Sequence, residues 1–184
     1  PQNIRKLLLE FHLDTVSSAR NPNDAIPALL ELRRIRPVTQ LAKLYAARDP
    51  AVMELGGVFF GIICRYVNSE HFLMIFADEL DDPDPIIRMF ACDALGELGK
   101  KDAIPLLKAL LRDDAIVPGY VDGRVNFAAA CSLAWLGNAD GFEVMFQWAE
   151  RNPDSWDGNV LKHFRRFGDR DLKTDLAAWR KYFR

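Results

Sequence analysis

The sequence lacks an apolar run long enough to cross a membrane. The longest such stretch, residues 58–64, ends at Arg65, well short of the roughly 18 residues that a membrane helix needs. The first residues are polar and carry no apolar segment of the kind found in signal peptides. We therefore expect a cytoplasmic protein. Nearly half of its 184 residues are apolar, which is typical of a folded domain with a buried core.

Cysteine and histidine are scarce. The three cysteines lie far apart, and each stands inside an apolar segment: Cys64, Cys92 and Cys131. This number and spacing argue against a disulfide framework and a zinc site, and predict reduced core residues. Each histidine stands in a different predicted helix, which favours structural or surface roles: His12, His71 and His163. We expect no metal and no cofactor.

Motifs of the common catalytic sites are absent too. The chain has no glycine-rich phosphate loop, no His-Glu-x-x-His and no Gly-x-Ser-x-Gly. The sequence therefore favours a non-enzymatic protein.

Charge is unevenly distributed along the chain. Residues 49–98 carry ten acidic and two basic side chains, whereas residues 1–48 and 155–184 each carry eight basic and four acidic ones. Basic ends around an acidic middle suit a protein partner, or a second copy, better than a nucleic-acid backbone.

What the chain does contain is an internal repeat. The pattern of residues 84–107 returns about 38 residues later, over residues 122–140. A third trace lies near the start, where residues 24–27 repeat the four residues 102–105 letter for letter, two repeat lengths away.

Each repeat unit is predicted to form two helices. The first has an apolar stripe at helical spacing, and Gly99 supplies its left-handed end. Asp102 is expected to cap the second helix, with Pro105 in its first turn. Because Ala91 and Ala129 stand 38 residues apart, we expect both at equivalent, buried close-packing positions. The stripe consists of Ile87, Ala91, Ala94, Leu95 and Leu98.

Extended along the chain, this pattern predicts an all-α fold, an α-α superhelix formed by a short solenoid of helical hairpins. Residues 1–184 are expected to form one domain of about five hairpins, with 171–184 as the C-terminal cap. Pro37 and Pro50 cut the segment 37–67 into two helices where one is expected, so this repeat is either kinked or has three helices. Helices are predicted near 3–19, 24–36, 38–48, 51–67, 70–80, 84–98, 102–113, 122–137, 140–151, 156–166 and 171–183.

Residues 82–113, with Arg88, Ala91, 94–99 and 102–105, resemble the HEAT-like repeat of the phycobilisome-lyase type. The resemblance is fair over 120–151 and weaker, but in phase, elsewhere. It implies that Arg88 and an acidic partner brace neighbouring units. Asn126 stands where this arginine would recur, with Arg124 nearby. This repeat class includes adaptor proteins, bilin lyases and distant DNA glycosylases.

Three functions follow. The sequence favours a non-enzymatic protein-protein interaction module, or scaffold. The resemblance alone also implies a bilin-lyase-like protein or phycobiliprotein chaperone. A HEAT-like DNA-binding or DNA-repair protein would need a continuous basic concave face, which the acidic block at 49–98 disfavours.

Two surfaces are candidates for the partner site. In the first, two long loops, 113–123 and 152–158, present aromatic anchors flanked by carboxylates; alternatively, the aromatics seal the core beneath these loops. Its residues are Tyr120, Trp156, Asp114, Asp122 and Asp157. The second is the concave face, lined by the second helices of the hairpins, with Glu70, Lys108, Arg112, Glu143, Gln147 and Arg151 expected to be exposed.

Overall fold

The computed structural model describes residues 2–20, 22–46, 70–117, 123–152, 164, 165, 172 and 175–183. Within them the chain is helical, and its one strand-like feature is an isolated antiparallel bridge between Ile116 and Arg124. The predicted all-α repeat fold is confirmed. Its elements are α1 (Gln2–Ser18), α2 (Pro22–Ile35), α3 (Pro37–Ala46), α5 (Glu70–Ala77), α6 (Pro85–Leu98), the 3₁₀ turn η1 (Lys101–Ala103), α7 (Ile104–Leu110), α8 (Val125–Trp135), α9 (Ala139–Arg151) and α11 (Leu176–Tyr182).

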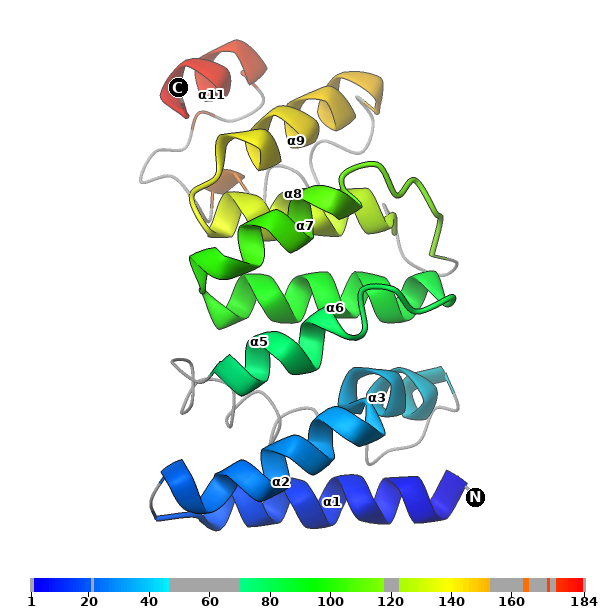
Figure 1. Ribbon diagram of the computed structural model, residues 1–184. Helices are drawn as coiled ribbons and strands as arrows, with labels where there is room; N and C mark the ends of the chain where they lie inside the picture. The colour runs from blue at the N-terminus through cyan, green and yellow to red at the C-terminus, as the bar shows by residue number, and fades with distance from the viewer. Residues whose placement is uncertain are drawn as a thin grey trace.

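The helices lie in two layers (Figure 1). α1, α6 and α8 run nearly parallel across the molecule, and α2, α5, α7 and α9 cross in front of them on a diagonal. α3 lies beside α2 and contacts α1 and α6. We call the side of the diagonal layer that faces away from α1, α6 and α8 the second-helix face. The loops that follow α5 and α7 lie together at one side of the stack, which we call the loop edge.

The unit α6–η1–α7 shows how local sequence determines each hairpin. The Asp84 side chain accepts a hydrogen bond from the Ile86 backbone N–H, and Pro85 stands in the first turn. Gly99 ends α6 with φ of 71°, the left-handed conformation that was predicted there. The apolar stripe of α6 is buried as expected.

Several predicted helix ends differ from those in the structure. Asp102 does not cap the second helix but lies exposed within η1, because the chain tightens into a 3₁₀ turn that buries Ala103. α7 ends at Leu110, not at 113. The last helix begins at Leu176, not at 171, because the extended Asp175 caps it by accepting from the Ala178 N–H.

Two predicted helices, 51–67 and 156–166, lie outside the described residues apart from Phe164 and Arg165, which are helical. In the ambiguous segment 37–67, the described part is α3, which starts at Pro37 directly after Arg36. Arg36 adopts φ of 56°, which turns the chain sharply between α2 and α3.

Close packing between α6 and α8 joins consecutive units. A Cβ added at Gly96 would lie 2.7 Å from the Ser132 Oγ. That hydroxyl donates to the Cys92 carbonyl oxygen at 2.8 Å, which ties the two helices together. Ala91 and Ala129 are both fully buried, as predicted.

The buried apolar side chains form two clusters. The larger one, which we call the main core, extends from α1 to α8 and is almost entirely aliphatic. The smaller one, the aromatic core, joins α8, α9 and α11 around Phe127, Phe146, Phe164 and Trp179.

Candidate interaction surface

Arginine side chains organise the loop edge. Arg88 of α6 forms a two-pronged ion pair with Asp113, with N–O distances of 2.7 and 3.2 Å. It also donates to the backbone carbonyls of Asp82 and Pro83. Asp113 also accepts a hydrogen bond from the Ala115 backbone N–H. Burial would raise the pKa of Asp113, but the hydrogen bonds and the charge of Arg88 outweigh it and lower the pKa. The brace expected at Arg88 is present.

The neighbouring units use different braces. Arg124, which precedes α8, donates to the Asp114 carbonyl oxygen at 3.0 Å. On the other side, the Arg36 Nη2 lies 3.1 Å from an Asp82 carboxylate oxygen and donates to the Asp78 carbonyl oxygen. Each described loop on this edge is therefore tied to the unit beside it.

A buried carboxylate caps a helix from a distance. Glu79 accepts from the backbone N–H groups of Val38 and Thr39 at 2.9 and 2.8 Å, and also from the Thr39 hydroxyl. It therefore satisfies donors at the start of α3 that have no partner within the helix. Burial raises the pKa of Glu79, and these hydrogen bonds and Arg36 partly oppose the shift.

The predicted loop-edge anchors are only partly covered by the described residues. Asp114 is exposed, as its proposed role requires. Tyr120, Asp122, Trp156 and Asp157 lie outside the described residues, so their role stays a prediction. Ile116 was not singled out from the sequence, yet it is 62% exposed on the same loop as Asp114.

The six polar side chains predicted to line the concave face belong to α5, α7 and α9 or lie just after α7. All six are exposed: Glu70, Lys108, Arg112, Glu143, Gln147 and Arg151. Some of them pair along or across the layer. Lys108 of α7 lies 2.6 Å from Asp140 of α9, and Gln147 donates to Glu143 at 3.2 Å. Arg180 of α11 lies within 3.4 Å of Glu143.

Sequence analysis missed a second group on the same layer. Leu30 of α2 and Met74 of α5 are large apolar side chains that are 48% and 42% exposed. Beside them, Arg33 forms a two-pronged ion pair with Asp78 at 2.5 and 3.0 Å. The only local signal is three arginines within four residues, at positions 33, 34 and 36; their meeting with α5 depends on tertiary structure.

Other groups with perturbed pKa values lie on α6 and α8. Desolvation and the nearby Glu97 carboxylate raise the pKa of Asp93 to about 7. Burial raises the pKa of the Cys92 and Cys131 thiols, which are both free and buried as predicted; Cys64 lies outside the described residues. In the described part of the chain, no three His, Cys, Asp or Glu side chains group as metal ligands.

No helix among the described residues combines the length and apolar character needed to span a membrane. The described second-helix face carries acidic as well as basic side chains. Within these residues it lacks the continuous basic surface that a DNA-binding function would require.

Comparison with known proteins gives one result. The family of HEAT repeats matches residues 45–121 and, in a second overlapping match, residues 75–157. No curated protein matches the chain. HEAT repeats generally mediate protein–protein interaction. The two matches together cover more than half of the sequence, and they include α5, α6, α7, α8 and α9. The chain belongs to the HEAT repeat family.

Proposed function

We propose that this chain is a non-catalytic protein-interaction module, or adaptor, whose partner contacts the second-helix face. Membership of the HEAT repeat family supports a binding role. The observation that carries the proposal is the row of exposed polar side chains on α5, α7 and α9 and at the end of α7. A row of this kind, supported by a rigid stack of helices, offers many weak contacts to an extended protein surface.

The pairs that cross this face are suited to exchange. The side chains of Lys108 and Asp140 are 44% and 53% exposed, and ion pairs in such positions contribute about 0–1 kcal/mol to stability. A partner can therefore replace an internal pair at little cost. Mixed charges on the face favour a polar protein surface with its own complementary pattern.

The loop edge is the second proposed contact. Tyr120 and Trp156 would anchor the partner, and Asp114, Asp122 and Asp157 would steer a basic surface towards it. The exposed Ile116, on the same loop as Asp114, supports an apolar contribution at this edge.

The experiment that tests the proposal is quantitative affinity capture from the native host with matched charge reversals. Arg112→Glu with Arg151→Glu changes the second-helix face, and Arg5→Glu with Arg20→Glu changes two exposed arginines at the other end of the described chain. We expect the first double variant to lose a specific partner and the second to retain it. If the two variants retain the same proteins as the parent chain, the second-helix face is not the contact.

Trp156→Ala separates the two proposed contacts. We expect it to weaken capture of the same partner while the melting temperature stays close to that of the parent. A loss of stability of about 3–5 kcal/mol would instead show that Trp156 packs in the core, and the loop edge would then lose its anchor.

A further inference from the structure

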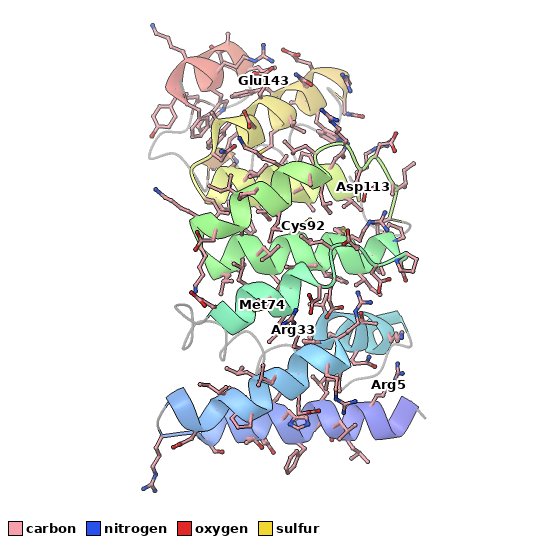
Figure 2. The ribbon with its side chains drawn as sticks, viewed as in Figure 1. Arg5, Arg33, Met74, Cys92, Asp113 and Glu143 are labelled. Atoms are coloured by element: carbon pink, nitrogen blue, oxygen red, sulfur yellow. The ribbon has the colours of Figure 1, made fainter. Side chains whose placement is uncertain are left out.

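An open groove lies where the end of α2 meets the end of α5. It is lined by one apolar side chain, three arginines and one carboxylate: Leu30, Arg33, Arg34, Arg36 and Asp78. Figure 2 shows Arg33 and Met74 next to each other between these two helices. α2 and α5, whose ends meet at the groove, belong to the same diagonal layer as α7 and α9 but lie nearer the N-terminal end of the stack (Figure 1).

Two of the arginines are fixed by the fold. Both carboxylate oxygens of Asp78 accept from Arg33, at 2.5 and 3.0 Å. The Asp82 carboxylate and the Asp78 carbonyl oxygen hold Arg36, each at 3.1 Å. Because these partners fix the two guanidinium groups before any ligand arrives, binding would cost little side-chain entropy.

Arg34 is held differently. Its side chain is 68% exposed, and its pair with Glu31, three residues earlier on the same helix, spans 2.7 Å. Exposed pairs of this kind contribute little to stability. Arg34 can therefore exchange Glu31 for a carboxylate of a partner, and an arginine accepts such a group with two parallel hydrogen bonds.

Leu30 lines the groove, and Met74 lies beside Arg33 at its edge. Leu30 and Met74 expose nearly half of their side chains, and the Met74 sulfur lies 3.8 Å from an Arg33 nitrogen. A single exposed leucine is ordinary, but an apolar pair next to arginines matches the composition of interface centres, where methionine and arginine are enriched. Methionine also adapts its shape to different side chains.

We propose that this groove binds an acidic segment of a partner protein, which places an aliphatic side chain on Leu30 and Met74 and a carboxylate on Arg34. The inference rests on the proposed interaction function and names the chemistry of the partner. The other two arginines of the groove are each paired with a carboxylate of the fold, so the exposed Arg34 is the cation that a partner's carboxylate reaches by exchange. Asp78 within the groove and Glu31 at its rim disfavour the continuous phosphate backbone of a nucleic acid.

The binding test uses three fluorescent peptides. The first has a central pair of leucines flanked by glutamates; the second has lysines in place of the glutamates, and the third has serines in place of the leucines. We expect the fluorescence anisotropy of the first peptide to rise when the wild-type chain is added. The affinity of the other two peptides should be lower by about tenfold or more. The affinity of the first should fall as salt is added, because the contact with Arg34 is exposed.

Matched variants locate the contact. Arg34→Glu and Leu30→Ser alter exposed side chains of the groove, and Arg112→Glu reverses an exposed arginine elsewhere on the second-helix face. We expect the first two variants to weaken the acidic leucine peptide about tenfold or more, and the third to leave it unchanged. Circular dichroism and melting curves should match the parent in all three.

Four outcomes would overturn the inference. The first is failure of the acidic leucine peptide to bind, and the second is binding that ignores Arg34→Glu. The third is loss of binding in Arg112→Glu alone, which moves the contact along the face and leaves the proposed function standing. The last is an oligonucleotide that binds more tightly than the peptide and is lost in Arg34→Glu, because the groove would then recognise phosphate. Loss of the captured partner in the Arg112 and Arg151 double variant tests the proposed function separately.

Discussion

The two cores are built from different side chains. The main core consists almost entirely of leucine, isoleucine, valine and alanine, and its single fully buried aromatic is Phe76 among the described residues. The aromatic core packs Phe127, Phe146, Phe164 and Trp179 beneath α11. Small and medium side chains suit a joint that repeats from unit to unit, whereas large rings cover the last unit with few residues.

α8 lies between the two cores and contributes side chains to both. Ala129 and Leu133 face the main core, whereas Phe127, Ala130 and Cys131 face the aromatic core. A helix with two buried faces has no polar stripe, and the sequence of α8 is accordingly apolar on all sides. The two cores therefore share a helix and not merely a surface, and α8 is the element through which damage to one core would reach the other.

Stacked rings hold the aromatic core together. The Trp179 ring stacks on Phe183 with centroids 5.6 Å apart, and Phe164 lies 5.6 Å from Trp179. Phe183 also stacks on Phe142 of α9 at 4.2 Å. Each such pair contributes about 0.5–1.5 kcal/mol beyond the burial of its area.

The largest expected effect comes from Trp179→Ala. Removing this fully buried ring should lower the free energy of unfolding by about 3–5 kcal/mol. Because the ring belongs to the aromatic core, we expect the C-terminal part to unfold first. Urea unfolding followed by circular dichroism and by tryptophan fluorescence checks this, since all four tryptophans stand at position 135 or later.

Leu95→Ala is the control for the main core. It should lower the free energy of unfolding by about 2–5 kcal/mol. The transitions followed by circular dichroism and by tryptophan fluorescence should still coincide. Two coincident transitions in Trp179→Ala would show that α8 couples the cores so tightly that they unfold as one.

The next effect concerns the joint between units. Ala91→Leu and Ala129→Leu each add three carbons at a fully buried position, and each should cost about 1–3 kcal/mol through overpacking. We expect Ala129→Leu to cost more, because α8 is confined by helices of both cores. Thermal melting of both variants beside Ala109→Leu, at an exposed position of α7, measures the difference. Equal melting of Ala91→Leu and the parent would contradict the close packing of this joint.

The elements that sequence predicted best are those with local causes. The left-handed turn at Gly99 and the buried stripe of α6 depend on residues a few positions apart, and the register of Ala91 and Ala129 follows from the repeat. Asp102 does not cap the second helix, because the chain forms a 3₁₀ turn there with Ala103 buried. The spacing of residues in the sequence does not reveal this burial.

The candidate surfaces were harder to predict because tertiary contacts create them. The exposure of Lys108 and Arg151 follows from helical periodicity, and it was predicted. Leu30 was not recognised, because an apolar residue on a helix is expected to face the core. The pair of Arg33 with Asp78 joins residues 45 positions apart, and no local pattern signals such a contact.

A smaller effect on stability should come from Asp93, a partly exposed carboxylate on α6 that lies near Cys131 of α8. Its pKa is raised from 3.8 to about 7, so the folded chain keeps a proton between these pH values that the unfolded chain releases. Stability therefore falls as the pH rises through this window. Asp93→Asn should raise stability at pH 8 by about 1–2 kcal/mol, less than the full shift implies because the group is partly solvated.

Urea unfolding from pH 4 to pH 8 checks the prediction for Asp93. The gain from Asp93→Asn should vanish near pH 4, where the parent side chain is protonated in the folded state. Asp14→Asn, an exposed aspartate on α1, is the control and should show no such gain. A gain of equal size at all pH values would mean that packing, and not charge, is responsible.

The smallest expected effect tests whether the surface or α8 joins the two parts of the molecule. Lys108 of α7 and Asp140 of α9 form an ion pair of 2.6 Å that spans the boundary between the main core and the aromatic core on the second-helix face. Both side chains are about half exposed, so Lys108→Met should cost only about 0.2–1 kcal/mol, and salt should remove the difference. Arg88→Met, which breaks a pair whose side chains are 15% and 21% exposed, should cost more and keep its effect in salt, because solvent and ions screen that pair less. Urea unfolding at low and high ionic strength measures both variants. A cost for Lys108→Met as large as that for Arg88→Met would mean that this surface pair, and not only α8, holds the two cores together, and a partner that captured Lys108 would then loosen the stack.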